Sequence, residues 1–236
     1  MKEYLSSGVF AEYKDAMIYL ERVQSDGKVR MGLIGKLDLE DYDYSVGSNS
    51  FVRATEGTVL DRIPPRQAVR RDAAVELPHV MLLIDDDKDT VIGPLKACDE
   101  VIYDFDLMEG GGHAKGWLVP DELKDGVMKA LAVLQEEQPL LFAVGDGNHS
   151  LASAKALYEE EKARFGQGSE DTLPSRYALV EIVNLYDEAL EFEPIHRVLF
   201  DVDAPALMDA LKAEYPGTFE GKGEGHVIQY AYDGGE

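Results

Sequence analysis

One stretch, Leu140–Phe165, constrains the fold of this chain more than any other. It reads LLFAVGDGNHSLASAKALYEEEKARF: an apolar run short enough for one buried strand, a turn with two glycines, and then apolar residues at helical spacing. Glycines let a backbone approach a ligand closely, and the start of a helix offers free N–H groups at the positive end of its dipole. The sequence therefore predicts an anion-binding turn between a strand and a helix.

Polar side chains crowd this turn. Asp146 brings a carboxylate and His149 an imidazole, and the positions expected to contact a phosphate are Gly145, Gly147, Asn148 and Ser150. Asp, Asn and Ser are also common helix caps, so a purely structural turn is the alternative. Capping does not require an imidazole, and His149 therefore favours a functional site.

Composition excludes several classes of protein. The chain has 236 residues, enough for a substantial core, and its 46 acidic against 23 basic residues give a net charge of −23. That charge repels nucleic-acid phosphates and argues against a nucleic-acid partner. A single cysteine, Cys98, an N-terminus without a signal-peptide core and the lack of a long apolar run predict a cytoplasmic protein with no membrane partner.

Strand and helix patterns alternate along the chain, which predicts a mixed α+β fold in a single domain. The pattern predicts a hairpin (15–23 and 29–38), a helix (65–75), two strands (79–84 and 101–107), a short strand (116–119), a helix (120–137), the strand–turn–helix of 140–165, a strand (176–184), a helix (204–215) capped by Asp203, and a last strand (227–232).

Basic residues gather in two places in this acidic chain. Arg53 and Arg62 belong to five arginines within residues 51–71, and with Thr58 they suggest a local phosphate clamp. His196 and Arg197 form a second basic, titratable pair that we expect near a site. Solvated surface charge is the alternative for both groups.

Three motifs occur in an order that is similar to a known family. They are Thr55-Glu56-Gly57-Thr58 with Asp61-Arg62, then FAVGDGNH ending at His149, and then Pro194-Ile195-His196-Arg197. This series, within about residues 29–200, resembles a broad prokaryotic family labelled domain of unknown function 1015. Members of that family are usually longer, which predicts that this chain is a shortened member or a fragment.

The resemblance implies a fold and a chemistry. The turn is similar to one in ParB-like and sulfiredoxin-like folds, which include free-serine kinases, and it implies such a core with a mixed sheet, flanking helices and an N-terminal hairpin. By this resemblance Asp146, Gly147 and His149 form the phosphate turn, and Glu56 is the glutamate that acts on the substrate hydroxyl.

The predicted function is a nucleotide-dependent phosphotransferase, a small-molecule kinase that acts on a hydroxyl-bearing metabolite. ATP or ADP would bind with Mg²⁺ at Asp146, and Glu56 would accept the proton of the attacking hydroxyl. His149, with Arg62 or Arg197, would stabilise charge on the transferred group.

Departures from the family pattern motivate a second hypothesis. The family has histidine and arginine at the positions of Asn148 and Ser150, and usually histidine at the position of Thr55. A nucleotide- or metabolite-binding protein without turnover is therefore the alternative. A ParB-like nucleic-acid protein is a third reading, which the charge disfavours.

Overall fold

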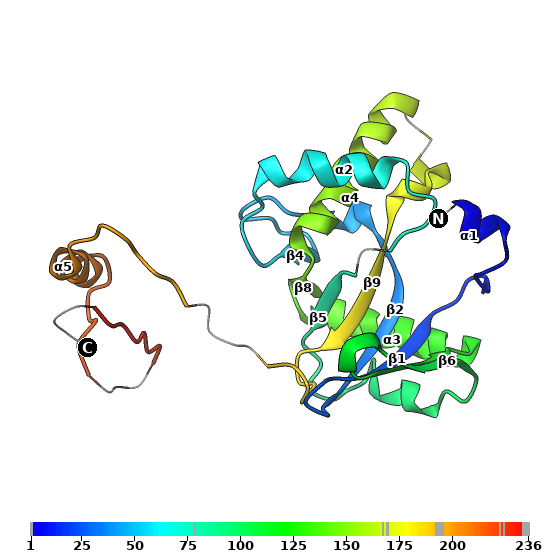
Figure 1. Cartoon of the computed structure of the whole chain (residues 1–236), viewed down its shortest axis with the longest axis horizontal. Helices are drawn as coiled ribbons and strands as arrows, with labels where there is room; N and C mark the ends of the chain where they lie inside the picture. Colours follow the sequence, from blue (N-terminus) through cyan, green and yellow to red (C-terminus); the bar gives the residue numbers. More distant parts are fainter. Residues whose placement is uncertain are drawn as a thin grey trace. The chain divides into compact units, whose positions relative to one another are not determined.

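The computed structural model of the chain describes residues 2–77, 79–166, 168, 170–191, 196–221, 223 and 225–232. The chain divides into two compact units, Met1–Glu191 and Phe192–Glu236. The first unit contains a nine-stranded sheet and four of the helices described below, and the second contains the helix α5 (Figure 1).

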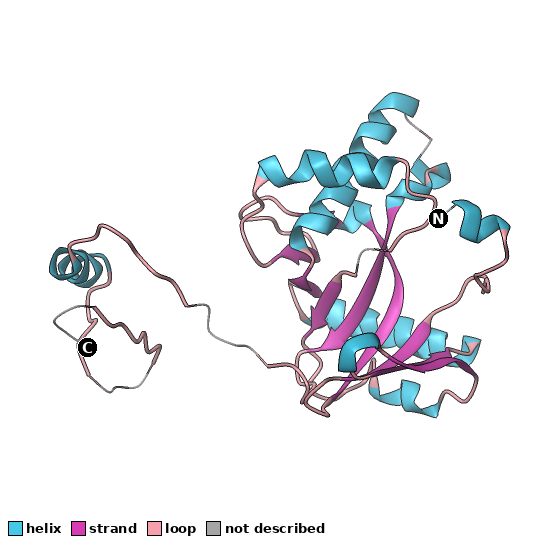
Figure 2. Ribbon diagram, viewed as in Figure 1, coloured by secondary structure: helices cyan, strands magenta, loops and turns pink. Residues whose placement is uncertain are grey.

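The sheet is mixed and strongly twisted (Figure 2). Its strand order is β3-β4-β8-β5-β9-β2-β1-β7-β6, with parallel pairing of β3 with β4, β4 with β8 and β5 with β9, and antiparallel pairing elsewhere. The strands are β1 Ile18–Val23, β2 Val29–Asp38, β3 Tyr42–Asp43, β4 Val52–Ala54, β5 Met81–Ile84, β6 Val101–Asp106, β7 His113–Leu118, β8 Phe142–Asp146 and β9 Tyr177–Asn184. The mixed α/β architecture predicted from the sequence is confirmed.

The predicted N-terminal hairpin is confirmed. Strands β1 and β2 pair antiparallel, from Ile18 opposite Ile34 to Val23 opposite Val29. Their turn contains Gly27 at φ +86, a conformation that glycine adopts without steric cost. This hairpin lies in the middle of the sheet, because β2 also pairs with β9 and β1 also pairs with β7.

Five α-helices are described: α1 Lys2–Ser6, α2 Ile63–Arg71, α3 Asp121–Glu137, α4 Asn148–Phe165 and α5 Ala204–Glu214. Helix α3 matches its prediction, since Pro120 precedes it and Val127 and Leu134 are buried. Helix α2 lies against α4, and Arg71 donates to both carboxylate oxygens of Glu160 at 2.6 and 2.7 Å (Figure 1). This packing fixes the two helices that border the candidate site.

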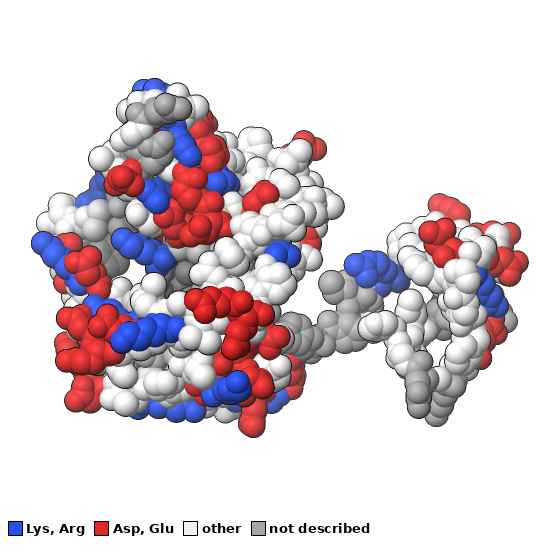
Figure 3. Space-filling view, turned by 180° about the vertical axis from the view of Figure 1, so that it is seen from behind, with Lys and Arg blue, Asp and Glu red and all other residues white. Residues whose placement is uncertain are grey.

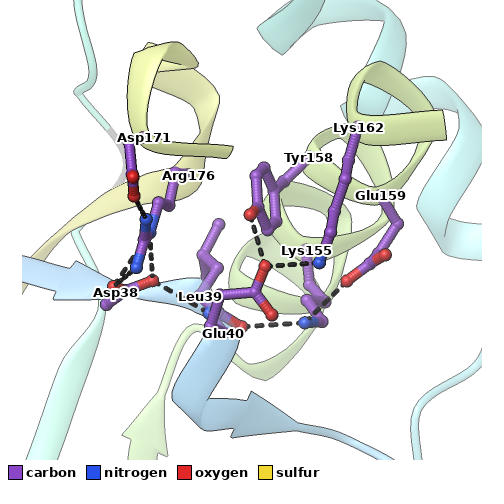
Figure 4. A network of polar contacts seen from close by, with 9 residues as sticks. All are labelled: Asp38, Leu39, Glu40, Lys155, Tyr158, Glu159, Lys162, Asp171 and Arg176. Carbon is purple, nitrogen blue, oxygen red and sulfur yellow. Dashed lines mark hydrogen bonds and ion pairs between the residues drawn. The ribbon is translucent and has the colours of Figure 1, made fainter. Parts of the chain in front are cut away.

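A hydrophobic core lies between the sheet and its helices. It includes Leu82 of β5, Val144 of β8 and Leu151 of α4, each fully buried. A polar network then ties the middle of α4 to the end of β2 (Figure 4). In that network Lys162 donates to Glu40 at 2.6 Å, and Lys155 donates to the carbonyl of Leu39 at 2.9 Å.

Two predictions of local structure need correction, and a short strand was missed. The stretch Val227–Tyr232 is not a strand, because only Tyr232 makes a single bridge in the part of the chain described. A strand needs a neighbour with which to pair, and all nine strands of the sheet precede Leu185. The strand β4 is too short to produce an alternating pattern and was not predicted. Helix α2 ends at Arg71, earlier than the predicted Val75.

Candidate functional site

The turn after β8 requires glycine. The strand ends at Asp146, and Gly147 then adopts a left-handed conformation with φ 89 and ψ 19. A Cβ atom at Gly147 would lie 3.1 Å from Cγ2 of Val80 and 3.3 Å from the carbonyl oxygen of His79. The backbone of the turn is therefore packed directly against the segment that leads into β5.

Helix α4 begins without a side-chain cap. Gly147 is its N-cap residue, and no side chain accepts a capping hydrogen bond there. The alternative of a turn built for capping by Asp146, Asn148 or Ser150 is therefore not what the described residues form. The first N–H groups of a helix have no partner within the helix, so this start favours an anion.

Asn148 joins the start of the helix to the segment after β4. Its Oδ1 accepts from the backbone N–H of Thr55 at 3.1 Å, and its Nδ2 donates to Oγ1 of Thr55 at 3.2 Å. Thr55 in turn donates from Oγ1 to the carbonyl of Val144 at 2.6 Å. Asn148 is 6% exposed, so its amide is part of the framework of the site.

Glu56 and His149 meet next to this junction. Nδ1 of His149 lies 3.4 Å from Oε1 of Glu56, and Nε2 accepts a hydrogen bond from the backbone N–H of Val59 at 3.2 Å. A backbone N–H can only donate, so Nε2 carries the lone pair and the ring proton is on Nδ1, facing the carboxylate. Both ring nitrogens of His149 are thus in use. The side chain of His149 is 12% exposed and that of Glu56 is 58% exposed.

The remaining predicted residues of the turn differ in exposure. Asp146 and Gly145 are exposed, and a Cβ at Gly145 would lie 2.8 Å from Cγ of Leu83. Thr58 has a buried hydroxyl without a hydrogen-bond partner among the described residues. Of these residues, Glu56 and His149 contact one another, and Thr58 and Asp146 are the chain neighbours of Val59 and Gly147.

The cluster of five arginines is largely engaged with protein groups. Arg53 donates to the carbonyls of Ser50 and Pro139, and Arg66 donates to the carbonyl of Arg62 at 3.0 Å. Arg70 contacts Glu76 and the carbonyl of Tyr177, and Arg71 pairs with Glu160. Of these five arginines, Arg62 alone has a guanidinium with no hydrogen bond or ion pair to a described residue. Arg62 follows Val59 by one turn, since its N–H donates to the carbonyl of Val59 at 3.0 Å.

A cavity of about 480 Å³ opens beside the turn. Its wall consists of α2, the segment 73–77 and the first two turns of α4, and apolar side chains alternate there with Arg66, Arg70 and Glu76. Ser150 and Ser153 border it from the helix. Its volume lies within the range of small-molecule sites.

His196 and Arg197 belong to the second compact unit. Both are exposed there, and Pro194 and Ile195 of the same motif lie outside the described residues. Their expected place beside the turn stays a prediction.

The carboxylate at the turn fits Mg²⁺, which keeps several waters, better than it fits a metal ion that is held by protein side chains alone. Within the residues described, no group of three or more His, Cys, Asp or Glu side chains is arranged to hold a metal ion. Mg²⁺ is usually bound through one or two carboxylates and keeps several waters. The exposed carboxylate of Asp146, beside the helix start, fits that pattern.

A second histidine near the turn was not predicted. His79 contacts Glu181 of β9, a carboxylate whose side chain is fully buried. Glu181 is the one acidic residue inside the apolar strand YALVEIVN. A buried carboxylate needs a positively charged or hydrogen-bonding partner. The position of Glu181 in an apolar strand was therefore the sequence signal that could have indicated a partner such as His79.

The surface agrees with the acidic composition. Figure 3 shows Asp and Glu side chains in several groups over one face, with Lys and Arg between them. In the part of the chain that the structure describes, no helix is both long and apolar enough to cross a membrane.

Comparison with known proteins identifies a family. The family model described as "Protein of unknown function (DUF1015)" matches residues 1–235. Neither the curated proteins nor the solved structures contain a match to this chain.

Proposed function

This chain belongs to the DUF1015 family, and we propose that it is a nucleotide-dependent phosphotransferase acting on a small hydroxyl-bearing metabolite. The observation that carries the proposal is the meeting of Glu56 with His149 at 3.4 Å beside the uncapped start of α4. An acid–base pair beside a helix start that favours an anion supports a phosphoryl transfer, which also needs cations to neutralise the transferred group.

The phosphates of the nucleotide, ATP or ADP, lie against the backbone of Gly147 and the first turn of α4. Asp146 binds Mg²⁺, mostly through water. The cavity beside Ser150 accommodates the nucleoside, because it begins at the third residue of the same helix. Phosphate contacts and space for the base are thus contiguous.

Glu56 accepts the proton from the acceptor hydroxyl. His149 orients the carboxylate of Glu56 through Nδ1, while the N–H of Val59 holds the imidazole in the required tautomer. Because both nitrogens of His149 are in use, the charge on the transferred group is left to Arg62 and to Mg²⁺. This changes the role first expected for His149 from stabilising charge to positioning a base.

A relationship to the ParB/sulfiredoxin-like fold is part of the same proposal. The strand–turn–helix of β8 and α4 supports it. A cytoplasmic location, where nucleotides are abundant, is also part of the proposal.

The alternative is a nucleotide- or metabolite-binding protein without turnover. One observation favours it: four of the five clustered arginines are engaged with protein groups, so few cations remain to neutralise a transferred phosphoryl group. This alternative predicts nucleotide binding without product.

A thermal-shift screen with ATP, ADP and CTP, each with Mg²⁺, tests the proposal. A ligand at about 100 times its Kd stabilises the folded state by about 2.7 kcal/mol, a clear rise in Tm. We expect a rise with at least one nucleotide that Asp146→Ala abolishes and that Asp125→Asn, a change on the exposed face of α3, leaves intact.

Turnover separates the two functions. With the nucleotide that binds, a coupled assay on serine and other small alcohols is expected to show product that Glu56→Gln reduces at unchanged nucleotide affinity. No rise in Tm with any nucleotide would refute the phosphotransferase and the nucleotide-binding form of the alternative.

A further inference from the structure

A buried ionic cluster lies on the other side of the turn from Glu56. Nε and Nη2 of Arg30 each donate to a carboxylate oxygen of Glu181 at 3.0 Å. Nε2 of His79 contacts Oε2 of the same carboxylate. Glu181 has a fully buried side chain, whereas that of His79 is 53% exposed. The cluster therefore links a buried anion to an accessible imidazole.

The sheet leaves room for this carboxylate. A Cβ atom at Gly32 would lie 2.4 Å from Oε1 of Glu181, so the side chain of Glu181 occupies the space above a glycine. Burial by itself would raise the pKa of Glu181, but the hydrogen bond from His79 and the charge of Arg30 outweigh it and the pKa is lowered. Glu181 is accordingly an anion at neutral pH.

The cluster is close to the glycine turn. The carbonyl of His79 packs against Gly147, 3.3 Å from where a Cβ would be. In the sheet, Met81 pairs with Asp146 on one side and with Glu181 on the other. Two strand spacings separate Asp146 from Glu181, which amounts to about 10 Å. His79 is two residues before Met81, on the segment that leads into the strand between the two carboxylates.

The two histidines beside the turn differ in whether a ring nitrogen is left without a protein partner. His149 has both ring nitrogens engaged, by Glu56 and by the N–H of Val59. His79 uses Nε2 for Glu181, and the described residues provide no partner for Nδ1. A half-exposed imidazole with one nitrogen fixed by a carboxylate can present the other to a ligand.

We propose that His79 is the imidazole that contacts phosphate in this site, and that Glu181 is its positioning residue. The inference rests on the proposed function and assigns to it a group that the sequence did not reveal. Protonated His79 donates from Nε2 to Glu181 and from Nδ1 to a phosphate oxygen held at Gly147. No covalent bond is formed or broken in this step.

The proposal predicts a pH dependence of phosphate binding. Three charged or titratable groups face the cluster from the elements around His79: Glu181 on β9, Arg30 on β2 and Tyr103 on β6. Burial, and then the charge of Glu181, raise the pKa of Tyr103, so it stays neutral and does not titrate with the imidazole. Within this cluster the imidazole of His79 is the group that the proposal places against phosphate.

Calorimetric titration with Mg·ATP and with inorganic pyrophosphate, from about pH 5.5 to about pH 8.5, tests the proposal. His79→Gln keeps a polar side chain but loses the positive charge. A charge-assisted hydrogen bond contributes about 1.5 kcal/mol or more, so we expect affinity to fall about ten-fold at low pH. The ligands also titrate in this range, and the comparison of variant with wild type at each pH removes that contribution.

His113→Ala is the matched control. His113 lies between Asp104 and Asp106 at 2.7 Å from each, on β7 at the other end of the sheet. The His113→Ala variant also loses an imidazole with carboxylate partners, and we expect its Kd values for both ligands to match wild type at every pH. Glu181→Gln is expected to reduce the pH dependence as His79→Gln does.

The outcomes separate this inference from the proposed function. Binding that Asp146→Ala abolishes but that His79→Gln leaves unchanged would overturn the role of His79 alone. No binding of either ligand to wild type would overturn both.

Nitrogen-detected NMR of the imidazoles of the wild-type protein provides a measurement that does not depend on a variant folding. We expect His79 with its proton on Nε2 at high pH and a shift of its Nδ1 resonance when pyrophosphate is added. A proton on Nδ1 without such a shift would contradict the proposal.

Discussion

The side-chain Oδ1 of Asn148 accepts a hydrogen bond from the backbone N–H of Thr55 at 3.1 Å, and the two residues are 93 positions apart. Asn148 is the first residue of α4, and Thr55 directly precedes Glu56. This bond therefore brings a carboxylate from one part of the chain to the imidazole at the start of the helix. The residue that departs from the family pattern is thus the one that holds the two halves of the site together.

Replacement of Asn148 tests this role. Asn148→Ala leaves the N–H of Thr55 without its acceptor, and a polar group left unsatisfied costs about 1–3 kcal/mol. We expect a loss of that size in urea unfolding. Asn49→Ala, at an exposed position, is the control and is expected to stay within about 0.5 kcal/mol of wild type. Equal stability of the two variants would contradict the framework role of Asn148.

Gly147 and Gly126 offer a pair of glycine replacements with opposite expected signs. Gly147→Ala places a Cβ at φ +89 and within 3.1 Å of Val80, so we expect destabilisation of at least about 1 kcal/mol. Gly126 lies inside α3 with nothing within 4 Å of its Cβ position. Gly126→Ala should therefore raise stability by about 0.5–1 kcal/mol. Thermal unfolding of both variants, against wild type, measures the two effects.

Gly32 is expected to be required by the carboxylate of Glu181. A Cβ there would lie 2.4 Å from Oε1, whereas a Cβ at Gly35 on the same strand would meet nothing within 4 Å. We expect Gly32→Ala to cost about 1–3 kcal/mol, as overpacking does, and Gly35→Ala to cost less. In a double-mutant cycle, Glu181→Ala should make Gly32→Ala milder. Additive losses would show that the two positions do not interact.

The network at the end of β2 predicts a loss of stability in acid (Figure 4). Burial would raise the pKa of Asp38, but the hydrogen bonds from Arg176 and from the N–H of Glu40, together with the nearby positive charges, outweigh it, and the pKa is lowered. Hydrogen bonds from Lys162 and Tyr158 lower the pKa of Glu40. Both carboxylates bind protons less readily in the folded chain than in the unfolded one. Their contribution to the free energy of unfolding is therefore complete above the ordinary carboxyl range, about pH 4, and is lost as the pH falls.

Urea unfolding at a series of pH values from about 7 to about 3 measures this dependence. Asp38→Asn should flatten it, since the amide does not titrate. Asp125→Asn, on the exposed face of α3, is the control and should follow wild type. A curve for Asp38→Asn that parallels wild type would assign the acid sensitivity to other groups.

Local patterns predicted much of the fold. The hairpin of β1 and β2, helix α3 and the cap of α5 by Asp203, whose Oδ1 accepts from the N–H of Ala206 at 3.1 Å, are confirmed. Each depends on residues a few positions apart, where turn and helix preferences operate. The strand predicted at Val227–Tyr232 has the right pattern but forms no ladder with any described residues beyond the bridge at Tyr232, so the prediction was wrong.

The sequence by itself determined the strand–turn–helix of β8 and α4, because its glycines and apolar spacing are local features. It also indicated, through resemblance to the family, that Glu56 and His149 belong together. Only the tertiary structure decided which nitrogen of His149 faces Glu56, and that His79 reaches Glu181. The physical reason is that these contacts form across neighbouring strands and loops, whose side-chain partners are set by sheet register and not by spacing along the chain.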